Sequence, residues 1–394
     1  MKSEAFKNSV GLVEKKFFTF AESPDEMVLE NGEKLGPVTL AYETLGRLND
    51  DKTNAILICH ALTGDAHVAG YYSESDLKPG WWDTLIGPGK GIDTDKYFVI
   101  CSNVLGGCMG TTGPSSENPK TGRPYGLDFP VVTVQDMVMA QKKLIDSFGI
   151  KKLKCLVGGS LGGMQVLKWA QIFPEMVDSA TVLASTLRHS ALAIAFNEVA
   201  RQSIIADPNW NNGHYYDNDK PAQGLSVARM IGHITYLSDE AMRQKFGRRL
   251  QDKKDFSFEF DGDFQVESYL HYQGAKFVDR FDANSLLYIT KAADYFDLTK
   301  YDRHEESLKT LQIAGTKFLI ISYTSDWLYP TYQSRGIVKV LKRNGLDVSF
   351  CEIEADCGHD AFLLENDRLT SIMTGFLSGG SGYTTESNMG TIND

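Results

Sequence analysis

The sequence has few of the features that mark membrane, secreted or nucleic-acid-binding proteins. No apolar run approaches the roughly 18–20 residues that a transmembrane helix needs, and the start of the chain shows no apolar signal-peptide core. Positive charge is in deficit, with 40 Lys and Arg against 51 Asp and Glu and a formal net charge of −11. Nucleic-acid and anionic-membrane binders carry basic surfaces instead. We therefore predict a soluble, cytoplasmic protein without nucleic-acid or membrane partners; a local basic pocket for a small anion is not excluded.

Cysteine is scarce as well, and its spacing does not suggest a disulfide framework. The six cysteines include no C-x-x-C pair, and Cys59 and Cys155 lie inside strand-like apolar runs. This pattern is typical of reduced core thiols in a cytosolic protein. The sequence also lacks a metal-ligand or phosphate-loop signature, so we predict no metal and no cofactor bound to the protein.

What the sequence does contain is a regular alternation of short apolar runs and helical patterns. With 394 residues, 42% of them hydrophobic, the chain can bury a large core. Near-continuous apolar runs predict buried strands at 55–59, 97–101, 153–157, 180–183, 317–322 and 348–353. Helical patterns at 134–148, 161–173 and 331–344 lie between them. The alternation predicts an α/β fold with a mostly parallel sheet flanked by helices.

The alternation is interrupted once, which predicts an inserted subdomain. Residues 187–306 contain helix-like segments and few strand-like runs, and the α/β pattern then returns. We predict an α/β core over 1–186 and 307–377, with a helical cap at 187–306 over the carboxyl edge of the strands, where ligand sites of open α/β sheets lie. Residues 378–394 are small and polar and predict a flexible tail.

The sharpest local signal is a G-x-S-x-G motif formed by Gly158, Ser160 and Gly162. It follows a predicted strand and precedes a predicted helix, which is the context of a nucleophile elbow. A serine hydroxyl is a weak nucleophile, so it needs a sharp turn that exposes it to a base. A plain strand-to-helix turn is the alternative interpretation, but the flanking elements favour a catalytic serine.

The partners of this serine follow in the order expected for the α/β-hydrolase fold. Asp326 comes directly after one predicted strand and His359 after the next. We predict that His359 takes the proton of Ser160 and that Asp326 orients the imidazole. Asp356 and Asp360 flank His359 and are alternatives for the acid, although each could instead cap a helix.

An oxyanion hole needs two backbone N–H donors. We predict that they belong to Leu161, which follows the nucleophile, and to Leu62, in the loop after the strand at 55–59. A simple turn is the alternative interpretation of that loop.

Longer motifs narrow the prediction to one family. The chain resembles the homoserine O-acetyltransferase family over about residues 15–375, in motifs that surround the predicted triad. They are HALTGD (60–65), GGCMGTTGPSS (106–116), GGSLGGMQ (158–165), FNEVARQSI (196–204), SVARMIGHITYLS (226–238) and CGHDAFL (357–363). The resemblance implies an α/β-hydrolase-fold acyltransferase of methionine biosynthesis that works by a ping-pong mechanism with acetyl-CoA as substrate.

The resemblance also implies substrate-binding residues and a homodimer formed through cap helices. Arg229 and Asp360 match the family positions that hold the carboxylate and the ammonium of homoserine, and Tyr236 is a candidate for the same pocket. A guanidinium fits a carboxylate as a bidentate fork. A surface ion pair for Arg229 and a helix cap for Asp360 are the alternatives.

Other functions remain open at this point. An esterase or thioesterase would use the same triad, and related enzymes use succinyl-CoA as donor or serine as acceptor. The pair Thr111–Thr112 resembles the acetyl-using pattern, since succinyl-using relatives often carry Ser at the first position. A catalytically inactive scaffold protein is the third alternative, which the intact triad disfavours.

Overall fold

The computed structural model describes residues 8–260, 262–299 and 304–379. Most of the predicted tail, from residue 380 onward, lies outside these residues. The centre of the fold is an eight-stranded sheet with the order β1-β4-β8-β5-β11-β12-β13-β14. Its strands are β1 (Lys16–Phe20), β4 (Val38–Leu45), β5 (Ala55–Cys59), β8 (Phe98–Ser102), β11 (Cys155–Gly159), β12 (Ser179–Leu183), β13 (Lys317–Tyr323) and β14 (Asp347–Ile353).

The sheet is parallel from β8 to β14, and its other edge is antiparallel. All six predicted strands are confirmed, with ends shifted by up to two residues. The sequence pattern missed β1 and β4. Both alternate between buried and more exposed residues instead of forming a continuous apolar run, because they lie at the antiparallel edge.

The described residues form the helices α1 (Val134–Ser147), α2 (Leu161–Ile172), α3 (Ala191–Ile205), α4 (Ala222–Tyr236), α5 (Asp239–Lys245), α6 (Gln265–Arg280), α7 (Ala283–Tyr295), α8 (His304–Ala314), α9 (Thr331–Arg343) and α10 (Asp367–Leu377). The three helices predicted from the sequence are α1, α2 and α9, and each ends one residue earlier than expected. Helix α1 begins at a capping box, in which the Thr133 side chain accepts from the Asp136 amide and the Asp136 carboxylate accepts from the Thr133 amide.

Short elements fill the connections between these helices and strands. They are the strands β2 (Met27–Val28), β3 (Lys34–Leu35), β6 (Ile86–Gly87), β7 (Ile92–Asp93), β9 (Glu117–Asn118) and β10 (Arg123–Pro124), and the 3₁₀ helices η1 (Gly126–Asp128), η2 (Pro174–Met176), η3 (Pro208–Gly213) and η4 (His359–Leu363).

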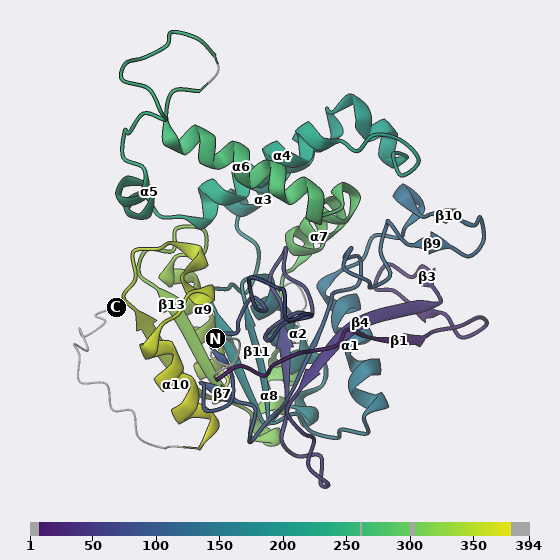
Figure 1. Cartoon of the computed structure of the whole chain (residues 1–394). Coiled ribbons are helices and arrows are strands. Elements are labelled where there is room, and N and C mark those ends of the chain that lie inside the picture. The colour runs from purple at the N-terminus through teal and green to yellow at the C-terminus, as the bar shows by residue number, and fades with distance from the viewer. Residues whose placement is uncertain (1–7, 261, 300–303, 380–394) are drawn as a thin grey trace.

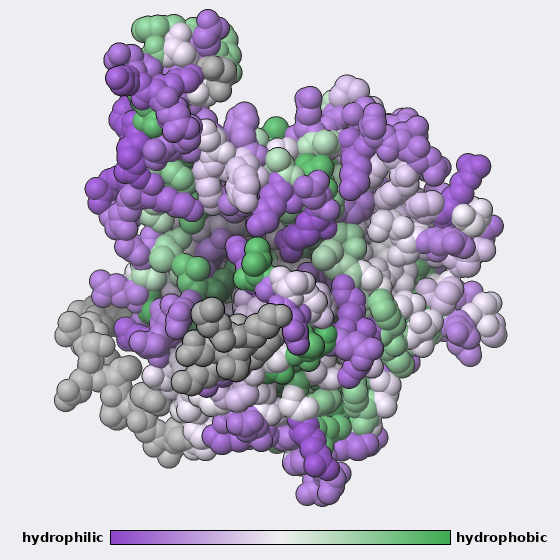
Figure 2. Space-filling view, in the orientation of Figure 1, coloured by the Kyte–Doolittle hydropathy of each residue, from purple (hydrophilic) through white to green (hydrophobic). Residues whose placement is uncertain are grey.

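Helices α3 to α7 form a layer above one end of the sheet (Figure 1). They all come from the stretch between β12 and β13, as the predicted cap does. Helix α8 starts inside the predicted insertion but packs against α2 beside the sheet. Figure 2 shows hydrophobic residues gathered along the hollow between the helical layer and the body below it.

Two hydrophobic clusters cover the two faces of the sheet. Along β5, Leu57 belongs to one cluster, and Ile56 and Ile58 to the other, as the period-two alternation of a strand requires. All six cysteines are free, and Cys59, Cys101 and Cys155 are buried. None of the helices in the described ranges is long and apolar enough to cross a membrane.

Candidate active site

Ser160 stands on a strained turn between β11 and α2. Its backbone has φ 57° and ψ −124°, a conformation that costs energy for a residue with a side chain. Neither of the two glycines of the G-x-S-x-G motif, Gly158 and Gly162, has room for a side chain. A Cβ on Gly158 would lie 2.4 Å from the carbonyl oxygen of Gly162, and a Cβ on Gly162 would lie 2.0 Å from that of Cys59. The local sequence thus allows β11 and α2 to meet closely enough to form the elbow.

The structure joins His359 to Asp326, in accordance with the predicted pairing. The Nδ1 atom of His359 lies 2.8 Å from the Oδ2 atom of Asp326, and both side chains are buried. The other carboxylate oxygen of Asp326, Oδ1, accepts the backbone N–H groups of Leu328 and Tyr329 at 3.0 and 2.8 Å. The two amides hold the carboxylate in place, so that it presents one oxygen to the imidazole.

Neither alternative acid takes this position. Asp356 receives a hydrogen bond from the Gln244 side chain, and Asp360 faces a pocket described below. Burial lowers the pKa of His359, but the charge of Asp326 and the hydrogen bond to it, with the charge of Asp360, raise that pKa overall above its ordinary value of 6.5. A carboxylate beside a buried imidazole therefore makes it a stronger base.

The two candidate oxyanion residues lie beside Ser160. Leu62 and Leu161 both line the same cavity as the serine. The loop that carries Leu62 is fixed by His60, whose Nε2 accepts from the backbone amide of Val104 at 3.0 Å and whose carbonyl accepts from Gln165 at 3.1 Å. His60 is thus a buried histidine with a structural role in this loop.

A pocket of about 190 Å³, here called the triad pocket, brings the predicted catalytic and substrate residues together. Its lining includes Leu62, Ser160, Arg229, Tyr236, His359 and Asp360. Arg229 and Tyr236 come from α4, whereas Asp360 comes from η4, which follows β14. The pocket therefore forms only where the helical layer meets the sheet.

Arg229 and Asp360 present opposite charges to the triad pocket. The guanidinium donates to the Thr63 hydroxyl at 3.2 Å and lies over the ring of Phe277. Among the residues that the structure describes, no carboxylate forms a salt bridge with Arg229. Burial raises the pKa of Asp360, while the charges of His359 and Arg229 act in the opposite direction. The arrangement can hold a small molecule that carries both a carboxylate and an ammonium group.

Sequence reasoning missed a second cavity that also reaches Ser160. This cap cavity, of about 70 Å³, is lined by Ser160 and by side chains of α3, α4 and α7, together with His189 and Tyr329. The sequence signal that could have found it is the FNEVARQSI motif, since Phe196, Asn197 and Ala200 line the cavity. Thr111, which the sequence pattern linked to the acetyl donor, lines neither cavity. Its hydroxyl bonds to backbone groups of Ala41 and Asn103.

The described part of the chain contains no group of three or more His, Cys, Asp or Glu side chains that could hold a metal ion. What the site offers is a buried serine, only 7% exposed, a histidine paired with a carboxylate, and a pocket of mixed charge. This combination can carry out acyl transfer.

The fold and these side chains define an enzyme of the α/β-hydrolase class, and comparison with known proteins agrees. The family model described as "alpha/beta hydrolase fold" matches residues 54–366. A homoserine O-acetyltransferase of Desulfotalea psychrophila is 63% identical over 373 residues, covering 94% of this chain and 96% of that protein.

Two solved structures are similar over nearly the whole chain. The homoserine O-acetyltransferase of Bacillus anthracis has a TM-score of 0.86 and 32% identity, covering 93% of this chain and 98% of that one. Esterase E22 has a TM-score of 0.84, also with 32% identity, covering 93% of this chain and 100% of that one. The chain belongs to the homoserine O-acetyltransferase family of the α/β-hydrolase fold.

Proposed function

We propose that this protein transfers an acetyl group from acetyl-CoA to the hydroxyl of L-homoserine, giving the ester used in methionine biosynthesis. The observation that carries this proposal is the triad pocket. Ser160 and His359 share it with the guanidinium of Arg229 and the carboxylate of Asp360, on a chain 63% identical to a homoserine O-acetyltransferase. An acyl-transferring triad beside a clamp for an amino acid fits a transferase better than a general hydrolase.

In the first half-reaction, His359 takes the proton of Ser160 while the serine oxygen attacks the thioester carbonyl. The backbone N–H groups of Leu62 and Leu161 would stabilise the oxyanion. The carbon–sulfur bond then breaks, His359 returns the proton to the sulfur, and free CoA leaves an acetyl ester on Ser160. Asp326 holds the imidazole in the required tautomer and stabilises its protonated form.

In the second half-reaction, homoserine occupies the triad pocket. Arg229 binds its carboxylate and Asp360 its ammonium group, with Tyr236 packed beside them. His359 takes the proton of the homoserine hydroxyl, whose oxygen attacks the acetyl ester. The ester bond to Ser160 breaks, and the serine recovers its proton from His359.

Water must lose the competition for the acyl-enzyme. A bound and oriented hydroxyl has a large advantage over solvent, with effective molarities of about 10⁵ M or more. The burial of Ser160 under the helical layer supports this requirement, because few water molecules reach a serine that is 7% exposed.

The test is to follow CoA release from acetyl-CoA or succinyl-CoA with homoserine, with serine, or without an acceptor. We expect rapid release only with acetyl-CoA and homoserine together, and none with Ser160→Ala. Preference for succinyl-CoA or for serine would contradict the proposed specificity but not the triad.

Ester hydrolysis is the second candidate function, because esterase E22 is structurally as similar as the acetyltransferase of Bacillus anthracis. The same assay separates the two. Equal CoA release with and without homoserine would mean that water is the true acceptor, and the esterase function would replace the transferase.

We further propose that the enzyme acts in the cytoplasm as a homodimer formed through cap helices. Apolar side chains at Leu192 and Val199 of α3 and at Val227 and Ile234 of α4 are exposed, each by more than 40%. Exposed apolar groups of this kind favour association. Light scattering after gel filtration tests the proposal, and a monomer at all protein concentrations would refute it.

A further inference from the structure

Two cavities meet at Ser160, and they differ in which catalytic groups they contain. His359 and Asp360 line the triad pocket, whereas the lining of the cap cavity includes neither of them. Arg229 lines both cavities, as do Leu62, Thr63 and Tyr236. The cap cavity is otherwise enclosed by side chains such as Ala193, Phe196 and Asn197 of α3.

The proposed ping-pong mechanism assigns different parts of the substrates to the two sides of the serine. His359 must protonate the departing sulfur and later deprotonate the incoming hydroxyl. Both atoms therefore approach the acyl carbon from the side that His359 faces, which is the triad pocket. Between the two half-reactions the acyl group stays on Ser160, so its chain must point away from His359, which leaves the cap cavity.

We propose that the cap cavity is the acyl pocket of this enzyme, and that Asp294 makes it selective for a short, uncharged acyl group. Asp294 does so by binding the N–H groups of the cavity wall and the guanidinium behind it. This inference rests on the proposed function. It assigns a role to residues of the FNEVARQSI segment that the reaction steps above do not use.

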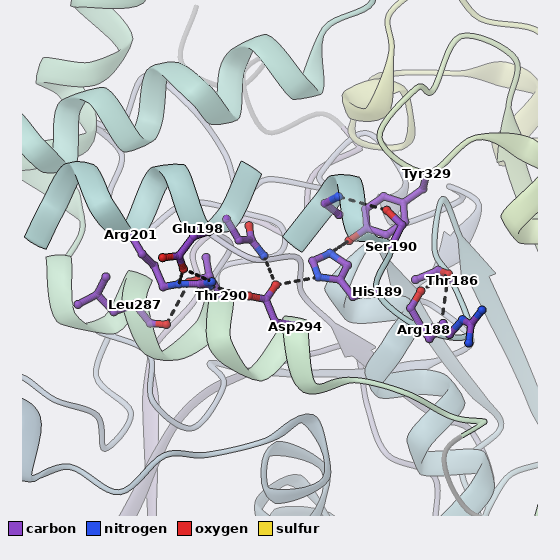
Figure 3. Close-up of polar contacts among 12 residues, drawn as sticks. Thr186, Arg188, His189, Ser190, Glu198, Arg201, Leu287, Thr290, Asp294 and Tyr329 are labelled. Carbon is purple, nitrogen blue, oxygen red and sulfur yellow. Dashed lines mark hydrogen bonds and ion pairs between the residues drawn. The ribbon is translucent and has the colours of Figure 1, made fainter. Parts of the chain in front are cut away.

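A hydrogen-bonded chain forms the polar wall of this cavity (Figure 3). The Tyr329 hydroxyl lies 3.0 Å from Nε2 of His189, and Nδ1 of His189 lies 3.0 Å from Oδ1 of Asp294. A carboxylate can only accept, so Nδ1 of His189 carries a proton, and in the neutral imidazole Nε2 then accepts from the Tyr329 hydroxyl. Asn197 donates its side-chain N–H to Asp294 at 2.8 Å. Tyr329 in turn interacts with the side chain of Ser160.

Behind this wall lies a buried guanidinium that is already neutralised. Nη1 of Arg201 faces Oδ2 of Asp294 at 2.7 Å, in a geometry that gives ionic attraction without a regular hydrogen bond. Arg201 also donates to Glu198 at 2.8 Å. Apart from Arg229, no Lys or Arg of the described residues lines the cap cavity.

This wall discriminates between acyl groups by charge as well as by size. The methyl group of an acetyl ester needs no polar partner and fits a cavity of about 70 Å³. A succinyl group would bring a second carboxylate into a buried space where His189, Asn197 and Arg201 are all bound to Asp294. The one cation of the lining, Arg229, is the group that the proposed function assigns to the homoserine carboxylate. The second carboxylate would stay unpaired or would compete with homoserine for Arg229, and an unpaired buried charge is strongly unfavourable, so the donor that carries it is rejected.

Asp294→Asn tests the proposal with little change in shape. The amide oxygen can still accept from His189, but Arg201 loses one of its two carboxylate partners and keeps only Glu198. We expect the ratio of kcat/KM for acetyl-CoA over that for succinyl-CoA to fall by about tenfold or more, which corresponds to one charge-assisted hydrogen bond gained by the second carboxylate. The ratio of acetyl-CoA to propionyl-CoA should stay unchanged, since neither donor carries that charge.

A matched control separates this effect from general damage. Asp282→Asn removes another carboxylate of the same helical layer, one that accepts from Tyr215 and Tyr216 and caps α7, and should leave the donor ratios unchanged. Structural damage would lower kcat/KM for all donors together. A folded Asp294→Asn enzyme with an unchanged acetyl-to-succinyl ratio would overturn the role of Asp294.

Ala193→Val tests the position of the acyl pocket without altering the ion pair. Ala193 is buried and lines the cap cavity, so the added methyl groups reduce its volume. With p-nitrophenyl acetate, propionate and butyrate as donors, we expect acylation of Ser160 to fall more for each longer chain, with the KM for homoserine unchanged. A raised KM for homoserine with an unchanged chain-length profile would place the acceptor there instead and overturn the proposal.

These ester assays follow acylation of Ser160 alone, so they report on the acyl pocket even if homoserine proves not to be the acceptor. A wild-type enzyme that fails to transfer acetyl to homoserine would refute the proposed function. Only the donor profiles of the variants bear on the cap cavity.

Discussion

Replacing Asp326 with Asn gives a prediction that can be worked out from the hydrogen bonds around the carboxylate. Oδ1 of Asp326 accepts two backbone N–H groups, and Oδ2 faces Nδ1 of His359. An asparagine has only one oxygen to share between these positions. Placing its NH₂ group toward the two amides would set donors against donors, so the oxygen must stay there and the NH₂ group must face His359.

This orientation forces His359 into the wrong tautomer. Facing a donor, Nδ1 must accept, so the proton of the neutral imidazole moves to Nε2, the atom that has to receive the proton of Ser160. The loss of the correct tautomer in a Ser–His–Asp triad lowers kcat by about 10⁴, which is roughly 5 kcal/mol at about 1.4 kcal/mol per factor of ten. We expect a decrease of that order in CoA release, with the fold retained.

The pH profile of the same variant provides an independent check. His359 acts as a base only when neutral, so activity rises as the pH passes its pKa, and the wild-type acid limb should lie above pH 6.5 because the pKa is raised. Asp326→Asn removes the charge that raises this pKa while the effect of burial remains. The acid limb should therefore move to lower pH. A variant within tenfold of wild-type activity, or an acid limb at higher pH, would refute the assignment of Asp326.

Three further variants test other parts of the site and the fold. Arg229→Lys keeps the charge but loses the bidentate fork, so the KM for homoserine should rise about tenfold or more with kcat for acetyl transfer little changed; steady-state kinetics with an unchanged KM would argue against a carboxylate clamp. Gly158→Ala places a methyl group 2.4 Å from the Gly162 carbonyl oxygen, and should destabilise the fold by about 3 kcal/mol, measured by urea unfolding; a loss below about 1 kcal/mol would contradict the close approach. Trp82→Phe removes the indole N–H that donates to the buried carbonyl of Phe362 at 2.8 Å, and should cost about 1–3 kcal/mol, seen as a lower Tm; an unchanged Tm would mean that the carbonyl finds another donor.

Much of the parallel sheet was predictable because its strands are buried on both faces. Runs such as AILIC at β5 and FVICS at β8 are apolar at nearly every position, and no exposed element needs such a composition. The antiparallel edge escaped prediction for the opposite reason. In β1 and β4, part of each strand faces less buried surroundings, so the pattern is mixed and resembles other half-exposed segments.

The sequence by itself determined the nucleophile elbow, the order of the candidate triad and the family. Each of these depends on the order of residues along the chain or on short motifs of consecutive residues. Only the tertiary structure decided that Asp326, and not Asp356 or Asp360, contacts His359. It also decided that Arg229 of α4 and Asp360 of η4 share one pocket, and that His189 and Asp294, 105 residues apart, bond beside Ser160. The packing of the helical layer on the sheet brings these distant side chains together, and no local periodicity in the sequence records that contact.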